Sequence, residues 1–323
     1  MITEHATPPG LCNLARQPQN RTSRQGEAKI LDRQPQSLGG PKRLAAARWL
    51  GISLFMTMSP LVRAAEKSGY TLLNPVPAAL MRELSTDRPD LTESAYTVDA
   101  GHFQIEMDVV NYSHNRADSV RTETLGIAPL NLKAGLCNNV DFQLVLEPYT
   151  SVRIKDEKNG TVERHRGFGD ITPRVKINLW GNDSGPTALA LMPFVKFPSN
   201  QDNLGNDAVE GGLIVPFACE LPAGWGMGAT SALGCMEDAS GGGHHPEFVN
   251  SIAFGHDIAG KLAGYIEFFS LVSTDDNARW IGSVDCGFTY ALTADIQLDA
   301  GINIGVTSSA PDFNPFLGLA WRF

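Results

Sequence analysis

The paired histidines His244 and His245 are the first residues of this sequence that could bind a metal or transfer a proton. They follow a run of three glycines, Gly241–Gly243. Imidazole is a common zinc ligand, but a zinc site needs three or four protein ligands. No third ligand lies close in the sequence, so we interpret this stretch as an external loop that is exposed to solvent. We expect no metal and no cofactor.

A glycine-rich stretch, Gly167-Phe168-Gly169-Asp170, superficially suggests a loop that binds phosphate. It lacks the Lys-Ser/Thr pair of such loops, and it opens an alternating segment rather than a helix. A hydrolytic centre would need a serine beside a histidine, and no pair of strand positions clearly offers one. The sequence therefore predicts no catalytic residues.

Ionisable residues that alternate with apolar ones point to a different chemistry, the electrostatic filtering of solutes. Arg174 and Lys176, for example, alternate with Val175 and Ile177. A period of two is that of a β-strand, so the charged side chains of such a stretch share one face. The full predicted set is Glu106, Asp108, Asp141, Arg174, Lys176, Lys196, Glu210, Glu267, Asp285, Asp299 and Arg322.

The same alternation recurs from residue 99 to the last residue. Short turns with Asn, Gly, Asp or Pro alternate with longer polar connections, which is typical of successive hairpins. We expect the longer connections, such as 112–119, 152–167 and 236–246, to face outside the cell. The twelve predicted strands are 100–111, 120–135, 140–151, 168–180, 187–198, 209–220, 225–235, 247–256, 262–273, 279–291, 296–307 and 313–323.

The last predicted strand places Leu317, Leu319, Trp321 and Phe323 on one face. A final strand that ends on an aromatic residue is typical of bacterial outer-membrane barrels. We expect Leu319, Trp321 and Phe323 to form the signal that the barrel-assembly machinery reads. Open sheet edges cannot exist in lipid. The sequence therefore predicts an all-β fold, a transmembrane antiparallel up-and-down β-barrel of about twelve strands that closes between its first and last strands.

The beginning of the chain resembles a secretory signal peptide. Lys42 and Arg43 precede the mainly apolar stretch 44–62, and small residues around Ala64 predict cleavage before Ala65. A membrane anchor is the alternative, but this stretch is short and contains an arginine. We therefore expect three parts: an extension with signal peptide (1–64), a segment of uncertain role (65–98) and an outer-membrane barrel (99–323). The barrel would reach the bacterial outer membrane through the secretory pathway.

Residues 65–98 do not alternate, and "MRELSTDRPDLTES" (81–94) is charged and contains proline. The segment precedes the first strand on the periplasmic side. Two readings stay open: a flexible periplasmic leader, or a partial plug that folds into the lumen.

Charge excludes one class of partner. Nine of the 26 basic and three of the 35 acidic residues lie in 1–64, which leaves residues 65–323 with a net charge of −15. Nucleic-acid binding requires Lys and Arg to neutralise phosphates, so we expect no nucleic-acid partner. The cysteines of this part, Cys137, Cys219, Cys235 and Cys286, form no C-x-x-C pair, and we expect them to be free.

Three stretches carry a family resemblance: "LSTDRPDLTESAYTVDAGHFQIEMD" (84–108), "GFGDITPRVKINLW" (167–180) and the ending "LDAGINIG…PDFNPFLGLAWRF". They resemble the outer-membrane family named for the MetA pathway of phenol degradation, whose members are often described as transporters. The resemblance implies a single outer-membrane β-barrel with a role in the uptake of small compounds, aromatic ones among them. It brings no catalytic residues.

The leading functional hypothesis is a channel or transporter for passive uptake of small molecules, aromatic or amphipathic ones among them. Twelve strands lie between the eight that side chains can fill and the sixteen of wide porins, so the bore should be narrow. Tyr265, Phe269 and Phe254 are predicted on the inner face, beside the charged groups. The partners would be outer-membrane lipid, the barrel-assembly machinery and the solute. The alternatives are a structural or adhesive barrel with a closed lumen and an outer-membrane lipid-modifying enzyme.

Overall fold

The computed structural model describes residues 67–323, so the predicted signal peptide lies outside the described residues. The described part begins with a largely irregular segment that includes the short 3-10 helix η1 (Ala78–Leu80), and a second one, η2 (Pro222–Gly224), follows a strand. The strands are β1 (Phe103–Ala117), β2 (Val120–Ile127), β3 (Leu130–Cys137), β4 (Val140–Leu146), β5 (Tyr149–Asp156), β6 (Val162–Gly167), β7 (Thr172–Trp180), β8 (Thr187–Lys196), β9 (Glu210–Glu220), β10 (Trp225–Glu237), β11 (His244–Ala259), β12 (Leu262–Ser273), β13 (Ile281–Ala291), β14 (Ile296–Gly305) and β15 (Phe313–Arg322).

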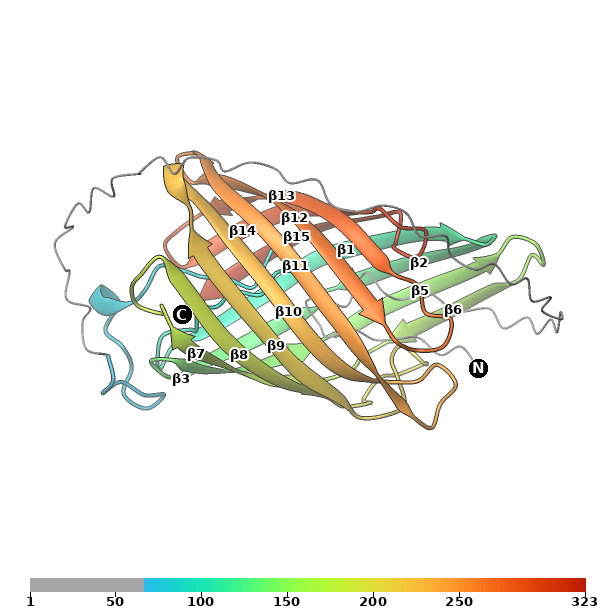
Figure 1. The fold of residues 1–323 in the computed structure, drawn as a ribbon, viewed down its shortest axis with the longest axis horizontal. Coiled ribbons are helices and arrows are strands. Elements are labelled where there is room, and N and C mark those ends of the chain that lie inside the picture. Colours follow the sequence, from blue (N-terminus) through green and yellow to red (C-terminus); the bar gives the residue numbers. More distant parts are fainter. Residues whose placement is uncertain (1–66) are drawn as a thin grey trace, which may run out of the picture. The chain divides into compact units, whose positions relative to one another are not determined.

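Three pairs of these segments are single strands with a short interruption. β2 and β3 both pair with β1, and Pro129 lies in the break between them. Pro148 separates β4 from β5 in the same way, and residues 168–171 separate β6 from β7. Proline lacks the N–H that a continuous ladder needs. The barrel therefore has twelve strands, as predicted, and Figure 1 shows them running obliquely around it.

The sheet closes because β15 pairs with β14 on one side and with β1 on the other. Gln104 lies opposite Arg322 in this antiparallel seam. At its end, the N–H of Phe103 donates to the carbonyl of Phe323 (3.0 Å), and the N–H of Phe323 donates back to Phe103 (2.9 Å). The predicted closure between the first and last strands is confirmed.

Some strands extend further than the sequence predicted. Residues 112–117 belong to β1, and most of 152–167 forms β5 and β6, although loops were expected there. His244 and His245 likewise begin β11 instead of lying in a loop. These stretches have few apolar residues on their outward face, so they lack the apolar–polar contrast by which the other strands were recognised.

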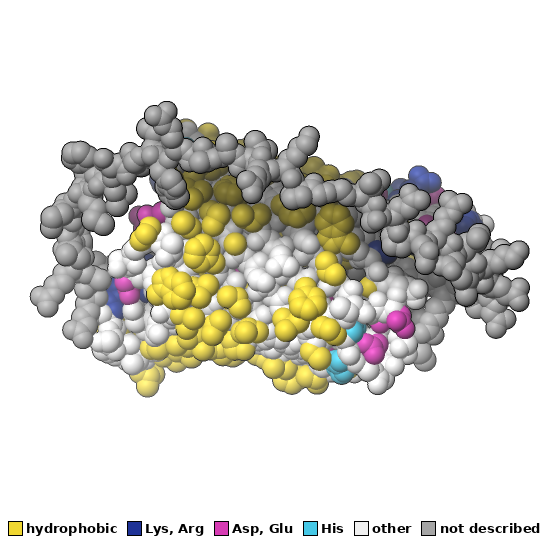
Figure 2. All heavy atoms as spheres, in the orientation of Figure 1, with side chains coloured by type: hydrophobic (Ala, Val, Ile, Leu, Met, Phe, Trp, Pro, Cys, Tyr) yellow, Lys and Arg dark blue, Asp and Glu magenta, His cyan; other side chains and the backbone are white. Residues whose placement is uncertain are grey.

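The two faces of the sheet differ in chemistry. Large hydrophobic side chains point outward and form the yellow band in Figure 2, whereas the inward positions are mainly buried and polar. Within residues 67–323, no helix is long and apolar enough to cross a membrane. The aromatic residues near strand ends are outward and between 44 and 54% exposed, namely Trp180, Trp225, Trp280, Tyr290, Trp321 and Phe323.

Replacing Phe323 by alanine is expected to lower the yield of folded barrel. Its ring stacks on Phe103 across the seam, with centroids 6.0 Å apart, and lies 5.0 Å from the ring of Trp321. Losing both contacts should weaken the seam by about 1–2 kcal/mol beyond the loss of buried area. Heat-modifiable gel mobility after refolding measures the folded fraction. Phe288→Ala, which removes an outward phenyl far from the seam, is the control, and equal yields would contradict a special role for Phe323.

Candidate functional site in the barrel lumen

The lumen contains residues 82–99, which we call the inner segment. At the end of the barrel with the short turns, the N–H of Arg82 donates to the carboxylate of Asp99 (2.9 Å), which joins the two ends of the segment. The guanidinium of Arg82 also donates to Asp183 (3.1 Å) and to the carbonyl of Asn138 (3.2 Å) in two of those turns. Between these ends the chain enters the lumen, turns near Asp90 and returns.

Asp87 is the centre of a charge network that joins the inner segment to β3 and β7. Its two carboxylate oxygens accept hydrogen bonds from Lys133 and Lys176, both at 2.5 Å. Arg174 adds a contact at 3.8 Å, and Glu106 on β1 pairs with Lys133. None of these five side chains is more than 5% exposed. Removing one partner of a buried ion pair is strongly destabilising, so the network fixes the position of Asp87.

The next residue, Arg88, binds a different part of the wall. Its guanidinium donates two hydrogen bonds to Asp299 on β14 (2.7 and 3.0 Å) and pairs with Asp108 on β1 at 2.7 Å. This fork geometry is among the stronger polar interactions in proteins. Gly318 on β15 makes room for it, because any side chain there would collide with the guanidinium. Consecutive residues thus tie the segment to separate strands.

The tip of the inner segment is bound to β12. The N–H of Leu91 donates to one oxygen of Glu267 (2.8 Å), and the hydroxyl of Thr92 donates to the other (2.6 Å). Glu93 begins the return and accepts a hydrogen bond from Arg174 on β7 (2.6 Å).

Wall side chains also satisfy the backbone of the returning half. Asn178 donates to the carbonyl of Ala95 (2.8 Å), and Asp141 accepts from the N–H of Val98 (3.0 Å). Backbone groups that would otherwise be buried without partners are therefore paired with β4 and β7. The segment is bound along its whole course rather than at one point.

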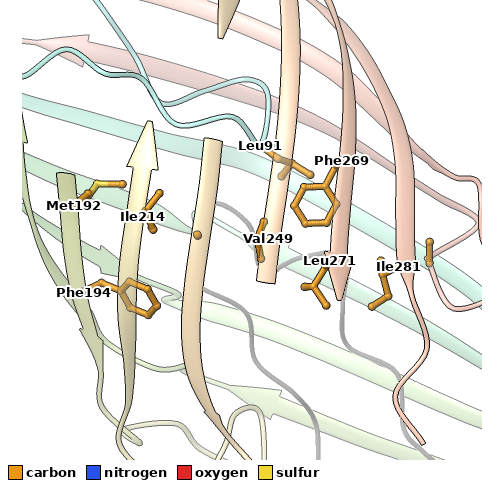
Figure 3. Packing of buried hydrophobic residues seen from close by; sticks show 10 residues of the cluster. Leu91, Met192, Phe194, Ile214, Val249, Phe269, Leu271 and Ile281 are labelled. Carbon is orange, nitrogen blue, oxygen red and sulfur yellow. The ribbon is translucent and has the colours of Figure 1, made fainter. Parts of the chain in front are cut away.

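An apolar cluster fills the lumen beside β8–β13. Leu91 of the inner segment lies next to Phe269 of β12, as Figure 3 shows. The members of this cluster are all at most 9% exposed, and a close-packed apolar region holds few voids larger than a water molecule. The other members of the cluster are Met192, Phe194, Ile214, Ala232, Val249, Leu271, Ile281 and Ala310.

A cavity remains on the other side. Its volume is about 100 Å³ measured by the positions that the centre of a water-sized molecule can take, and the empty space around it, open solvent included, is about 780 Å³. The inner segment from Asp87 to Leu91 forms one of its walls, and β1, β3, β4, β7, β14 and β15 contribute the rest. The lining combines carboxylates and two arginines with three asparagines and the apolar residues Leu130, Val145 and Phe316. Mixed apolar walls and a few polar groups are typical of small-molecule sites.

The carboxyl groups of the inner segment differ in their preferred charge. Burial alone would raise the pKa of Asp87, but Lys133, Lys176 and Arg174 outweigh it and hold that pKa well below its usual value. Burial raises the pKa of Glu93 to about 7, although Arg174 opposes this. Burial and the nearby charge of Glu267 raise the pKa of Asp90 well above its usual value. Asp87 is therefore ionised at neutral pH, whereas Asp90 favours its neutral form.

The eleven predicted lumen residues all lie on the inner face, and most of them bind the inner segment. Lys196 and Glu210 instead pair with each other, and Asp285 lies opposite Glu267 and accepts a hydrogen bond from Ser283 (3.1 Å). Those that hydrogen-bond or ion-pair with the segment are Glu106, Asp108, Asp141, Arg174, Lys176, Glu267, Asp299 and Arg322.

Sequence reasoning missed Lys133 and misplaced Phe254. Lys133 alternates with Leu132 and Ala134, so the pattern that identified the other lumen charges could have found it. The prediction that Phe254 faces the lumen is wrong, because it lies opposite Ile266, an outward residue that is 52% exposed. Apolar residues occupy both faces of β11 at this point, so alternation could not distinguish them.

The histidines have structural partners. His102, His165, His244 and His256 each hydrogen-bond a backbone carbonyl, at 2.8–3.1 Å. His245 is different, because potential ligand atoms of Asp238, His245 and Asp275 lie within 4.8 Å of one another.

Hydrogen bonds explain why these three residues lie close together, because they join the loop that contains Asp238 to the loop that contains Asp275. Nδ1 of His245 lies 3.1 Å from Asp238, and Asp275 accepts from the N–H of Ala239 at 3.2 Å. We therefore assign no metal to it. The four cysteines of the described residues are free, and none lies in this grouping.

Comparison with known proteins places this barrel in a family. Residues 86–323 match the family described as "Putative MetA-pathway of phenol degradation". The chain belongs to this family. The match begins at Thr86, so it includes most of the inner segment as well as the barrel. No curated protein sequence matches the chain.

The chain is similar to several solved structures, and one of them superposes well enough to show the same fold. An outer membrane channel from Pseudomonas putida F1 superposes with a TM-score of 0.51 at 14% identity, over 74% of this chain and 100% of that one. The NanC porin gives 0.44 at 11% identity, over 68% and 100% of the two chains. The transport unit of the autotransporter AIDA-I from Escherichia coli gives 0.44 at 11% identity, over 69% and 90%.

Proposed function

We propose that this protein is an outer-membrane channel for passive uptake of small amphipathic molecules, aromatic ones among them. The inner segment would close the lumen at rest. One observation carries the proposal: the segment is held by ion pairs and hydrogen bonds to wall residues, while a cavity of mixed lining remains beside it. Membership of the family and the shared fold support it.

The outward face suits a position in the outer membrane. Its hydrophobic side chains would contact lipid, and the aromatic residues near strand ends would lie at the interfaces. The row Leu319, Trp321 and Phe323 would be recognised by the assembly machinery. The long connections would face outside, and the inner segment would enter from the periplasm.

The cavity favours solutes that combine an apolar part with hydrogen-bond donors. Carboxylates outnumber arginines in its lining, and Phe316 offers a ring face that lies 5.9 Å from the guanidinium of Arg88. A weakly cationic or neutral aromatic solute should therefore enter more readily than an aromatic carboxylate.

One observation favours a second candidate, a structural barrel whose lumen never opens. The apolar cluster beside β8–β13 and the dense ion pairs around Asp87 together fill much of the bore. A network of this kind would also serve a purely structural role.

Swelling of proteoliposomes tests the proposal. Brief openings of the resting channel should let vesicles with the folded protein swell faster than empty vesicles in an isotonic aromatic amine, more slowly in an aromatic carboxylate, and not measurably in a disaccharide. The same rate as empty vesicles for every solute would favour the structural barrel. Equal rates for amine and carboxylate would contradict the solute preference but not the channel.

A further inference from the structure

Residues 110–117 of β1 together with β2, β5 and β6 form a four-stranded sheet that extends beyond the breaks at Pro129 and Pro148, toward the right in Figure 1. The register places their side chains in rows across the sheet. The first outward row is apolar and contains Val110, Ile127 and Tyr149. This row continues the hydrophobic band that surrounds the barrel.

The next three outward rows are basic. Arg166 lies in the row of Tyr112 and Leu125, two residues beyond the apolar row. His114 and Glu123 share the following row with two arginines, and the last row holds three more cations. The six cations, which we call the basic patch, are Arg116, Arg121, Arg153, Lys155, Arg164 and Arg166.

Ion pairs within the protein account for only part of the patch, in which Arg116 pairs with Glu157 at 2.5 Å. Glu123 pairs with Arg153 at 2.9 Å and with Arg121 at 3.7 Å, and it is the only acidic residue in these rows. Within residues 67–323, Lys155, Arg164 and Arg166 take part in no ion pair. Six outward cations are unexpected in a chain whose residues 65–323 carry a net charge of −15.

The inward face of the same strands has a different chemistry. Val152 and Ile154 pack there against Leu204 of the loop between β8 and β9. The cations are therefore confined to the face that continues the lipid-facing band. Figure 2 shows dark-blue side chains at this end of the barrel.

The distance of the basic patch from the apolar row matches the distance of lipid head groups from the hydrocarbon core of a membrane. Strands rise roughly 3.4 Å per residue, so the basic rows lie roughly 7–20 Å beyond the apolar row along strands. A tilt of about 45° reduces this to roughly 5–14 Å along the membrane normal. Guanidinium groups form paired hydrogen bonds with phosphate.

We propose that the basic patch binds the phosphate groups of an anionic glycolipid in the leaflet on the loop side. The inference rests on the proposed outer-membrane location but not on conduction. The occupant is a lipid because the patch directly adjoins the apolar row Val110–Ile127–Tyr149, which would contact the acyl chains of the same molecule.

Native mass spectrometry of the full chain in neutral detergent tests this, with diphosphorylated lipid A as the probe. The double variant Arg164→Gln, Arg166→Gln should bind lipid A roughly twenty-fivefold more weakly, since each charge near an anionic surface contributes roughly fivefold. The loss should shrink at high salt. The control Lys261→Gln removes an exposed cation in the turn between β11 and β12, at the other end of the barrel, and should stay within about twofold of the wild type.

Dephosphorylated lipid A separates phosphate binding from packing. It should bind the wild type and the double variant equally, and an equal loss for both lipids would overturn the proposal. Equal affinity of the double variant and its control for lipid A would also overturn it. Heat-modifiable mobility checks folding first. If the double variant does not fold, Lys155→Gln replaces it, with a loss of roughly fivefold expected and no loss contradicting the proposal.

Discussion

Replacing Asp87 by asparagine is expected to lower the free energy of unfolding by about 3–5 kcal/mol. The carboxylate of Asp87 is shared by Lys133 and Lys176, each at 2.5 Å, and asparagine cannot carry the charge that compensates them. Two buried ammonium groups would then lose the counter-charge that they share, although Lys133 would keep its ion pair with Glu106. Unfolding by urea in detergent, followed by heat-modifiable gel mobility, measures the change.

Asp90→Asn is the matched control, because it makes the same substitution three residues away on the same segment. Its carboxyl favours the neutral form, owing to burial and Glu267, so the neutral amide should change the free energy of unfolding by less than about 1 kcal/mol. Equal destabilisation by the two substitutions would show that the network around Asp87 does not hold the segment.

The stabilities of Asp87→Asn and Asp90→Asn, each relative to the wild type, should depend on pH in opposite ways. The folded-state pKa of Asp87 is lowered, so its stabilisation is present above the unfolded pKa of about 3.9 and is lost as the pH falls below it. The difference in the free energy of unfolding between the wild type and Asp87→Asn should therefore shrink below about pH 4. The pKa of Asp90 is raised, so its contribution is lost as the pH rises through the folded value. Asp90→Asn should gain stability relative to the wild type as the pH rises.

Replacing residues 84–98 by a Gly-Ser linker of equal length is expected to open a cation-preferring pore. The eleven predicted lumen residues comprise seven carboxylates and four cations, and Lys133 adds a fifth cation. Excess negative charge in a narrow water-filled bore attracts cations. The preference should weaken at high salt because the field is screened.

A reversal potential under a KCl gradient measures that preference. Anion preference would contradict the assignment of the wall charges. The linker also leaves Lys133 and Lys176 without Asp87, so folding is checked by gel mobility. If the linker protein does not fold, the full-length double variant Asp87→Asn, Arg88→Gln takes its place, since it weakens both attachments and keeps the chain length.

The barrel could be predicted from the sequence because its strands carry a local signal. In β14, Leu298 and Ile304 face outward while Asp299 and Asn303 face inward. This alternation can be recognised in the sequence of the strand alone, without knowledge of the neighbouring strands. Where outward and inward residues do not differ in polarity, the predicted strand boundaries were wrong. Residues 112–117 are polar on both faces, so their strand was mistaken for a loop.

The inner segment could not be placed from the sequence, because its partners are remote. Arg88 binds Asp299, which is 211 residues away, and Asp87 binds Lys176, which is 89 residues away. No periodicity within residues 82–99 encodes these contacts. The charged pattern of Asp87-Arg88-Pro89-Asp90 suits a solvated leader as well as a plug, and only the three-dimensional neighbours distinguish the two.

Planar-bilayer recording of the wild type beside the linker protein tests the central claim, that the inner segment closes a channel. We expect a wild-type current near zero with at most brief openings, and sustained steps at least about tenfold larger in mean current after the segment is replaced. If both proteins stay silent, the barrel is structural. If the wild type shows the same sustained steps as the linker protein, the inner segment does not close the lumen.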